Sequence, residues 1–160
     1  MFDLAQFREY IIKPSTSIIK EYSEDAEELL VFTCAVESLG GKYLKQVGGP
    51  ACGIYQMEPF THDDLWRNYI KHRTRLTYPL GYNMCINQIP LPQRLVYDLA
   101  YATVMARIHY LRVPEALPNK DDVDAMWDYY KTYYNTSKGK ATKAKSLKKY
   151  KDFTTSPNAK

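Results

Sequence analysis

The sequence has few of the residues that build disulfide frameworks and metal sites. Only three of its 160 residues are Cys, and Cys34, Cys52 and Cys85 lie far apart in the chain. Their odd number and wide spacing argue against a disulfide framework and against a zinc site. The three His include no pair at helical spacing. We therefore expect no metal site and no cofactor.

Long apolar segments are also missing. No stretch approaches the roughly 20 apolar residues that a membrane-spanning helix needs. Asp3 lies where the basic start of a secretory signal peptide would be expected. We therefore expect no membrane partner and no signal peptide. The protein would stay in the cytoplasm of the cell that makes it, or leave by lysis or inside a particle.

The remaining composition is that of an ordinary globular domain with an excess of one aromatic residue. Hydrophobic residues make up 45% and charged residues 25% of the chain, which allows a core without disulfides or metals. Tyr outnumbers Phe by 15 to 5. Because Tyr joins a flat apolar ring to a polar tip, this excess suits a wet groove that stacks on sugars. Tyr packed at the edge of the core is an equally good interpretation.

Positive charge gathers near the C-terminus. Residues 138–160 contain eight Lys and one Asp, although the whole chain carries a net charge of only +4. We expect a single domain over residues 1–150 and a basic, polar tail over residues 151–160. The Lys-rich segment can hold an anionic polymer such as cell wall or nucleic acid, or it can be a solvated tail that aids solubility.

Apolar periodicity predicts a mainly α-helical fold with few strands. The expected helices cover residues 2–12, 24–39, 61–70, 93–112, about 119–134 and 142–150. Pro14 is expected to end the first helix, and the prolines within residues 76–92 predict a long irregular connection there. Thr61 is expected to cap the third helix, and the helix over residues 93–112 is apolar on most faces, as a central buried helix would be.

Glu37 lies in the last turn of the second expected helix, between the N-cap Ser23 and the pair Gly40-Gly41. Its surroundings are apolar, and the helix C-terminus is negative, so both burial and the helix dipole favour the neutral carboxyl. A carboxyl that is neutral near pH 7 can protonate a leaving oxygen, as glycoside cleavage requires. A surface Glu at a helix end is the structural alternative.

The residues that follow Glu37 resemble those of a known family. Glu37-Ser38 is followed by Gly53-Ile54-Tyr55-Gln56, then by Pro59 and Thr61. This order is similar to the lytic transglycosylase branch of the lysozyme-like superfamily, which has Glu-Ser at a helix end, Gly-Leu-Met-Gln, and a Pro and a Thr at the same spacing. Two later features of that family are matched loosely, by Tyr110-Leu111, with Arg107 in place of a Gly, and by Tyr134-Asn135, with Gly139 two residues late. The segment from Trp127 to Thr142 also resembles small bacteriophage proteins of this kind.

The resemblance implies a lysozyme-like helical domain with a short irregular or β-containing loop after the catalytic helix. It implies that Glu37 protonates the glycosidic oxygen between N-acetylmuramic acid and N-acetylglucosamine in peptidoglycan glycan strands, and then acts as a base. The other implied site residues contact the substrate or support Glu37: Ser38 near the acetamido group, Gly53 as a point of close backbone approach, Tyr55 at a family Met position, Gln56 bracing the Glu37 loop, Tyr134 as a hydrogen-bond partner near Glu37, and Asn135.

The sequence leaves the chemistry and the biological role open. No Asp or Glu lies between residues 38 and 57, which favours a single-Glu transglycosylase over a hydrolase with a second carboxylate; Glu58, Asp63 and Asp64 are the next acids. The first alternative is a weakly active or inactive lysozyme-like component of a phage virion or tail, with other virion proteins as partners. The second is a nucleic-acid-binding helical domain, which has no base-reading motif to support it. The location implied is the host cytoplasm during synthesis or the phage virion.

Overall fold

The computed structural model describes residues 1–135 and 139–155, and it confirms a mainly helical fold. In chain order the elements are α1 (Leu4–Phe7), the π-helix η1 (Arg8–Ile12), α2 (Lys13–Ile18), α3 (Glu24–Ser38), α4 (Pro59–Asn68), the 3₁₀ helix η2 (Ile70–His72), α5 (Thr74–Met84), α6 (Arg94–Tyr97), α7 (Leu99–Leu111), α8 (Val123–Tyr130), the π-helix η3 (Lys131–Asn135) and α9 (Lys143–Thr154). No β-strand forms within these described residues. None of their helices is both long and apolar enough to cross a membrane.

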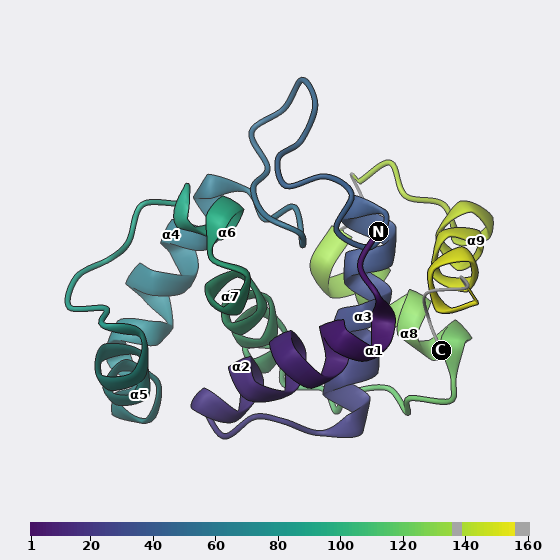
Figure 1. Ribbon diagram of the computed structural model, residues 1–160. Coiled ribbons are helices and arrows are strands. Elements are labelled where there is room, and N and C mark those ends of the chain that lie inside the picture. Colours follow the sequence, from purple (N-terminus) through teal and green to yellow (C-terminus); the bar gives the residue numbers. More distant parts are fainter. Residues whose placement is uncertain (136–138, 156–160) are drawn as a thin grey trace.

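Helix α7 lies in the middle of the molecule (Figure 1), with α4 and α5 on one side and α3, α8 and α9 on the other. Nine of the 13 residues of α7 are buried and the other four are partly buried, as expected for a helix that is apolar on most faces. The expected helix over residues 93–112 is nevertheless broken. Asp98 separates α6 from α7 and caps α7, because its carboxylate accepts a hydrogen bond from the Tyr101 amide at 2.9 Å.

Helix α3 follows its sequence prediction closely. The Ser23 hydroxyl caps it by accepting a hydrogen bond from the Ala26 amide at 3.1 Å. The left-handed residue that ends the helix is Leu39, one position before the expected glycines, and Gly40 and Gly41 continue with positive φ. A side chain on Gly41 would collide with the ring of Phe2. Glu37 therefore lies in the last turn of α3, as predicted.

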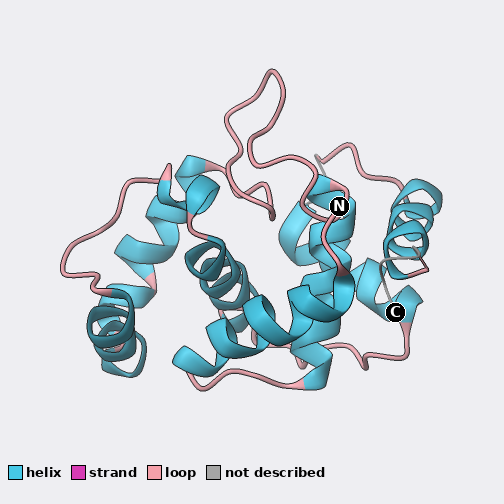
Figure 2. Ribbon diagram, viewed as in Figure 1, coloured by secondary structure: helices cyan, strands magenta, loops and turns pink. Residues whose placement is uncertain are grey.

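The long loop between α3 and α4 projects from one side of the molecule (Figure 2). Two isolated antiparallel bridges, Lys45 with Cys52 and Cys52 with Met57, are the β-type pairing that this loop contains. Helix α4 begins earlier than predicted, because Pro59 occupies its first turn and Glu58 is its N-cap residue. Thr61 therefore lies inside α4, and the prediction that it caps the helix was wrong.

Two prolines were wrongly predicted to exclude helix. The chain remains helical through Pro14, because the π-helix η1 precedes it: the Lys13 amide bonds to the Arg8 carbonyl, and this wider turn moves carbonyls away from the proline ring. Pro79 lies inside α5. Leu76, Leu80 and Met84 are buried on one face of α5, and their burial outweighs the lost hydrogen bond.

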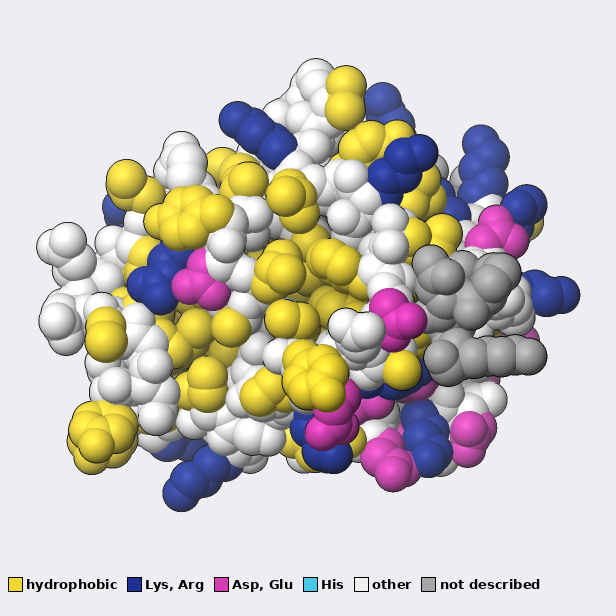
Figure 3. Space-filling view, in the orientation of Figure 1, with side chains coloured by type: hydrophobic (Ala, Val, Ile, Leu, Met, Phe, Trp, Pro, Cys, Tyr) yellow, Lys and Arg dark blue, Asp and Glu magenta, His cyan; other side chains and the backbone are white. Residues whose placement is uncertain are grey.

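Helix α9 packs mainly against α3 and is longer than the helix expected over residues 142–150. It continues to Thr154, and the Phe153 side chain is buried beside Phe7, with ring centroids 6.4 Å apart. The packed structure therefore extends past residue 150. The Lys side chains of this segment stand out from the surface around α9, on the right of Figure 3.

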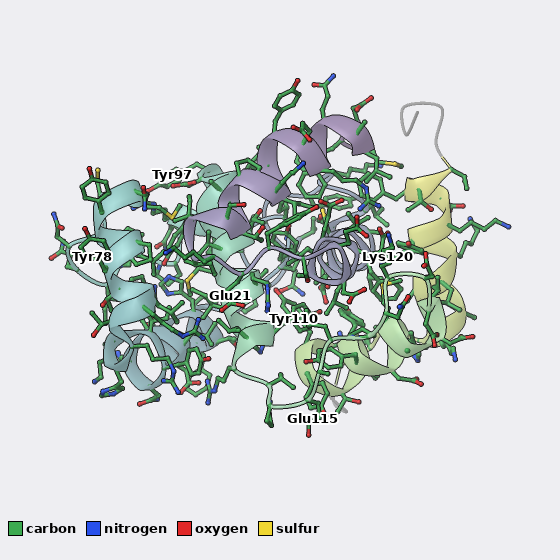
Figure 4. All side chains as sticks on the ribbon, turned by 90° about the horizontal axis from the view of Figure 1, so that it is seen from below. Glu21, Tyr78, Tyr97, Tyr110, Glu115 and Lys120 are labelled. Carbon is green, nitrogen blue, oxygen red and sulfur yellow. The ribbon has the colours of Figure 1, made fainter. Side chains whose placement is uncertain are left out.

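The Tyr excess is explained in part by the core. Tyr110 is buried in the interior, and its hydroxyl shares a 2.7 Å hydrogen bond with the Thr33 hydroxyl of α3. Tyr78 and Tyr97 lie instead at the outer edge of the molecule (Figure 4), where 69% and 75% of their surface is exposed.

Candidate functional site

A cavity of about 640 Å³ lies at the C-terminal end of α3. The end of α3 supplies Glu37, the loop before α4 supplies Gln56 and Glu58, and η3 supplies Tyr134 and Asn135. Helix α9 and the residues before it add three lysines to the lining of the cavity, Lys140, Lys145 and Lys149. The volume of the cavity is that of a ligand-binding pocket, and both acidic and basic side chains line it.

Glu37 is half-buried at the wall of this cavity. The Tyr130 hydroxyl, from the last turn of α8, donates a hydrogen bond of 2.5 Å to Oε1 of Glu37. The Tyr130 ring is itself fully buried and packs edge-on against Phe32, with centroids 5.6 Å apart. A fixed aromatic residue therefore holds one carboxyl oxygen of Glu37 in place.

Burial raises the pKa of Glu37 above its ordinary value, because the neutral carboxyl loses less solvation than the charged one. The hydrogen bond from Tyr130, the charge of Lys149 and the side chain of Asn135 lower the pKa of Glu37, but burial outweighs them. Lys149 is positioned by its own hydrogen bond, since Nζ donates to the Val36 carbonyl at 2.7 Å. The result is a carboxyl that keeps its proton to a higher pH than a surface Glu.

The resemblance implied that Tyr134 hydrogen-bonds near Glu37, but the residue that bonds to the Glu37 carboxyl itself is Tyr130. The Tyr134 hydroxyl donates to the Tyr55 carbonyl at 2.8 Å, while its ring lines the cavity. Tyr130, four residues earlier, makes the bond to Glu37. Tyr130 ends α8 and Tyr134 lies in the π-helix η3, where its ring packs on His109 and Tyr110 of α7, so sequence spacing could not tell which one reaches the carboxyl.

Gln56 and Asn135 line the cavity, as the sequence led us to expect of substrate-binding residues. Gln56 adopts a left-handed backbone conformation, with φ of 47°, and its Nε2 donates to the Gly53 carbonyl at 2.8 Å. Asn135 accepts a hydrogen bond from Lys131 Nζ at 2.8 Å. The rest of the late motif, residues 136–138, lies outside the described residues.

Three other predicted site residues do not line the cavity. Ser38 is fully buried, where its hydroxyl donates to the Cys34 carbonyl and accepts from the Gly41 amide, so it closes the end of α3. Tyr55 is buried, with its hydroxyl 3.3 Å from that of Thr103 on α7. Gly53 does permit a close backbone approach, but the approaching group is the Leu95 carbonyl, 2.3 Å from where a Cβ would lie. We therefore reassign Ser38, Tyr55 and Gly53 to supporting the loop and helix that form the site.

Glu58 is the second carboxylate in the cavity wall among the described residues, and its side chain is exposed. The other two candidate acids have partners outside this cavity. Asp63 bonds to the His62 ring at 2.9 Å, and Asp64 pairs with Arg112. Neither lies in the first turn of α4.

Two functional candidates escaped sequence reasoning. Neither Tyr130 of α8 nor His109 of α7 is among the site residues predicted from the sequence. His109 lines the cavity, and burial lowers the pKa of its ring to about 4, so the ring is neutral at pH 7. Among the described residues, no cluster of His, Cys, Asp or Glu could hold a metal ion.

Comparison of the chain with models of protein families, with curated proteins and with solved structures gives no match.

Proposed function

We propose that this protein cleaves the glycan strands of bacterial peptidoglycan, between N-acetylmuramic acid and N-acetylglucosamine, with Glu37 as the general acid and base. The observation that carries the proposal is a carboxyl with a raised pKa, held by Tyr130 at the wall of a cavity large enough for sugar rings. The resemblance of Glu37-Ser38 and the Gly53–Gln56 segment to lytic transglycosylases supports the choice of substrate.

In the proposed reaction, the neutral Glu37 carboxyl gives its proton to the glycosidic oxygen as the bond from that oxygen to the muramic C1 breaks. The hydrogen bond from Tyr130 stabilises the carboxylate that remains. That carboxylate then takes the proton of the muramic 6-hydroxyl, whose oxygen attacks C1. The products are a free 4-hydroxyl on N-acetylglucosamine and a 1,6-anhydro ring on the muramic acid, and Glu37 is neutral again.

The basic wall of the cavity fits this substrate class. Lys140 and Lys145 have exposed side chains with no ion pair among the described residues, so they can approach an anionic polymer. Peptidoglycan carries carboxylates on its substituents, and such groups would lie favourably beside these lysines. The charge of Lys149 also favours the ionised Glu37 that the second step requires.

Zymography on purified cell wall tests the proposal with wild type, Glu37→Gln and, as a matched acid on the same cavity, Glu58→Gln. We expect clearing by wild type and by Glu58→Gln, and none by Glu37→Gln. Equal clearing by wild type and Glu37→Gln would remove Glu37 from the mechanism. Folded wild type that clears nothing would favour a structural component of a phage particle instead.

Mass spectrometry of the released fragments identifies the attacking group. Anhydro ends are expected from the transglycosylase reaction. Reducing ends together with inactivity of Glu58→Gln would mean that water attacks and that Glu58, the other carboxylate of the described cavity wall, activates it.

A further inference from the structure

A second cavity, of about 370 Å³, adjoins the first. Thr61 of α4 and His109 of α7 line both cavities, so these two residues lie at the boundary between them. The far side of the second cavity is built from Phe60, Arg112 and Tyr133. Its volume is within the range of small-ligand pockets.

Phe60 is the most unusual residue of the second cavity. It lies in the first turn of α4, and 80% of its surface is exposed. An exposed Phe ring gains no free energy from burial in the folded chain, and it offers a flat apolar face to a ligand. The Tyr133 ring, on η3, lines the same cavity and is steadied by an edge-on contact with Tyr129, with centroids 4.8 Å apart.

His109 supplies a polar group at the boundary. Its Nδ1 is buried and has no hydrogen-bond partner among the described residues. The ring proton is then favoured on Nε2, because a proton on Nδ1 would be buried without an acceptor. The ring is held by packing on Tyr134, with centroids 4.8 Å apart, so the neutral imidazole has a fixed orientation.

The charges of the second cavity cancel. Arg112 and Asp64 both line it, and they pair with each other. This distinguishes it from the first cavity, where three lysines form one wall. The second cavity therefore suits a neutral, polar ring rather than an anion. It offers a flat aromatic face from Phe60, a neutral hydrogen-bonding ring from His109 and an ion pair whose charges compensate each other.

We propose that the two cavities form one continuous groove, and that the second holds a further sugar ring of the glycan strand whose bond Glu37 cleaves. The pyranose ring stacks on Phe60 and hydrogen-bonds to His109 at the boundary. This inference rests on the proposed function, because it takes the same strand as the ligand. It assigns to Phe60 and His109 a role in binding longer strands, apart from the bond-breaking step.

Calorimetric titration of the Glu37→Gln protein, which leaves the ligand intact, tests the inference. The probes are two purified cell-wall glycan fragments, the disaccharide and the octasaccharide. In this background we expect Phe60→Ala to weaken binding of the octasaccharide about tenfold, as the loss of one aromatic stacking contact would. Binding of the disaccharide, which the first cavity alone can hold, should not change. Phe60→Trp, which retains a flat ring, should restore the affinity for the octasaccharide.

Tyr78→Ala is the matched control, because Tyr78 is an exposed aromatic residue of α5 outside both cavities. It should leave binding of both fragments unchanged. If Phe60→Ala binds the octasaccharide as well as its parent does, the second cavity is not part of the groove, and the proposed function still stands. If neither fragment binds, the proposed substrate is wrong, and the inference fails with it.

Discussion

Replacement of Tyr130 by Phe probes the contact that defines the site. The change removes one hydroxyl, which donates to Oε1 of Glu37 at 2.5 Å, and keeps the buried ring that packs on Phe32 and Trp127. That hydrogen bond lowers the pKa of Glu37 and opposes the effect of burial. Tyr130→Phe should therefore raise the pKa of Glu37 further.

The size of the effect depends on the charge of Glu37. A hydrogen bond to a charged group contributes about 1.5–3 kcal/mol, and one to a neutral group about 0.5–1.5 kcal/mol. A carboxyl whose pKa is higher in the folded state destabilises that state as pH rises through the folded pKa. The loss of unfolding free energy in Tyr130→Phe should thus be about 1 kcal/mol larger at alkaline pH than at acidic pH.

Denaturant unfolding at acidic and at alkaline pH measures this difference. Tyr134→Phe is the control: it removes a neighbouring hydroxyl whose acceptor, the Tyr55 carbonyl, does not titrate. Its destabilisation should be the same at both pH values. A pH-dependent loss in Tyr134→Phe with none in Tyr130→Phe would refute the reasoning and return Glu37 to the partner that the sequence suggested.

Three further predictions follow from the same structure. Glu37→Gln should abolish clearing of cell wall. Because folding raises the pKa of Glu37, the same change should raise the unfolding free energy above the folded pKa, by about 1.4 kcal/mol for each unit of the net rise, and should leave it unchanged at acidic pH. Gly53→Ala should cost about 2 kcal/mol or more in denaturant unfolding, because φ is 76° and the new Cβ would meet the Leu95 carbonyl at 2.3 Å; an unchanged midpoint would contradict the backbone geometry. Lys149→Met should move the alkaline limb of the activity–pH profile to higher pH, because Lys149 lowers the pKa of Glu37, whereas Lys148→Met, which removes only an exposed pair with Asp152, should leave the profile in place.

Local features of the fold could be predicted because their causes are local. The Ser23 cap requires only a side-chain hydroxyl three residues before the amide that it accepts from. The apolar character of α7 follows from the identity of its consecutive residues. Local patterns wrongly predicted that Pro14 and Pro79 would exclude helix. Pro14 lies in a helix that is retained by the π turn before it, and Pro79 lies in a helix whose apolar face is buried against other elements. Neither the π turn nor that burial is specified by the proline and its immediate neighbours.

The candidate site also combines features that the sequence determines with features that depend on packing. The sequence by itself determined that a carboxyl ends an apolar helix at Glu37 and that Gln56 and Asn135 are polar residues on nearby segments. Each of these features depends only on which residues stand at which positions of the sequence.

Only the tertiary structure decided which groups meet. It brought the Tyr130 hydroxyl to Glu37 across 93 positions of sequence, and it buried Ser38 and Tyr55 instead of leaving them in the cavity. It also set Phe60 and His109 around a second hollow beside the first. The physical reason is that the pKa of Glu37 and the shape of the groove depend on burial and on contacts between distant elements, which packing determines and spacing does not.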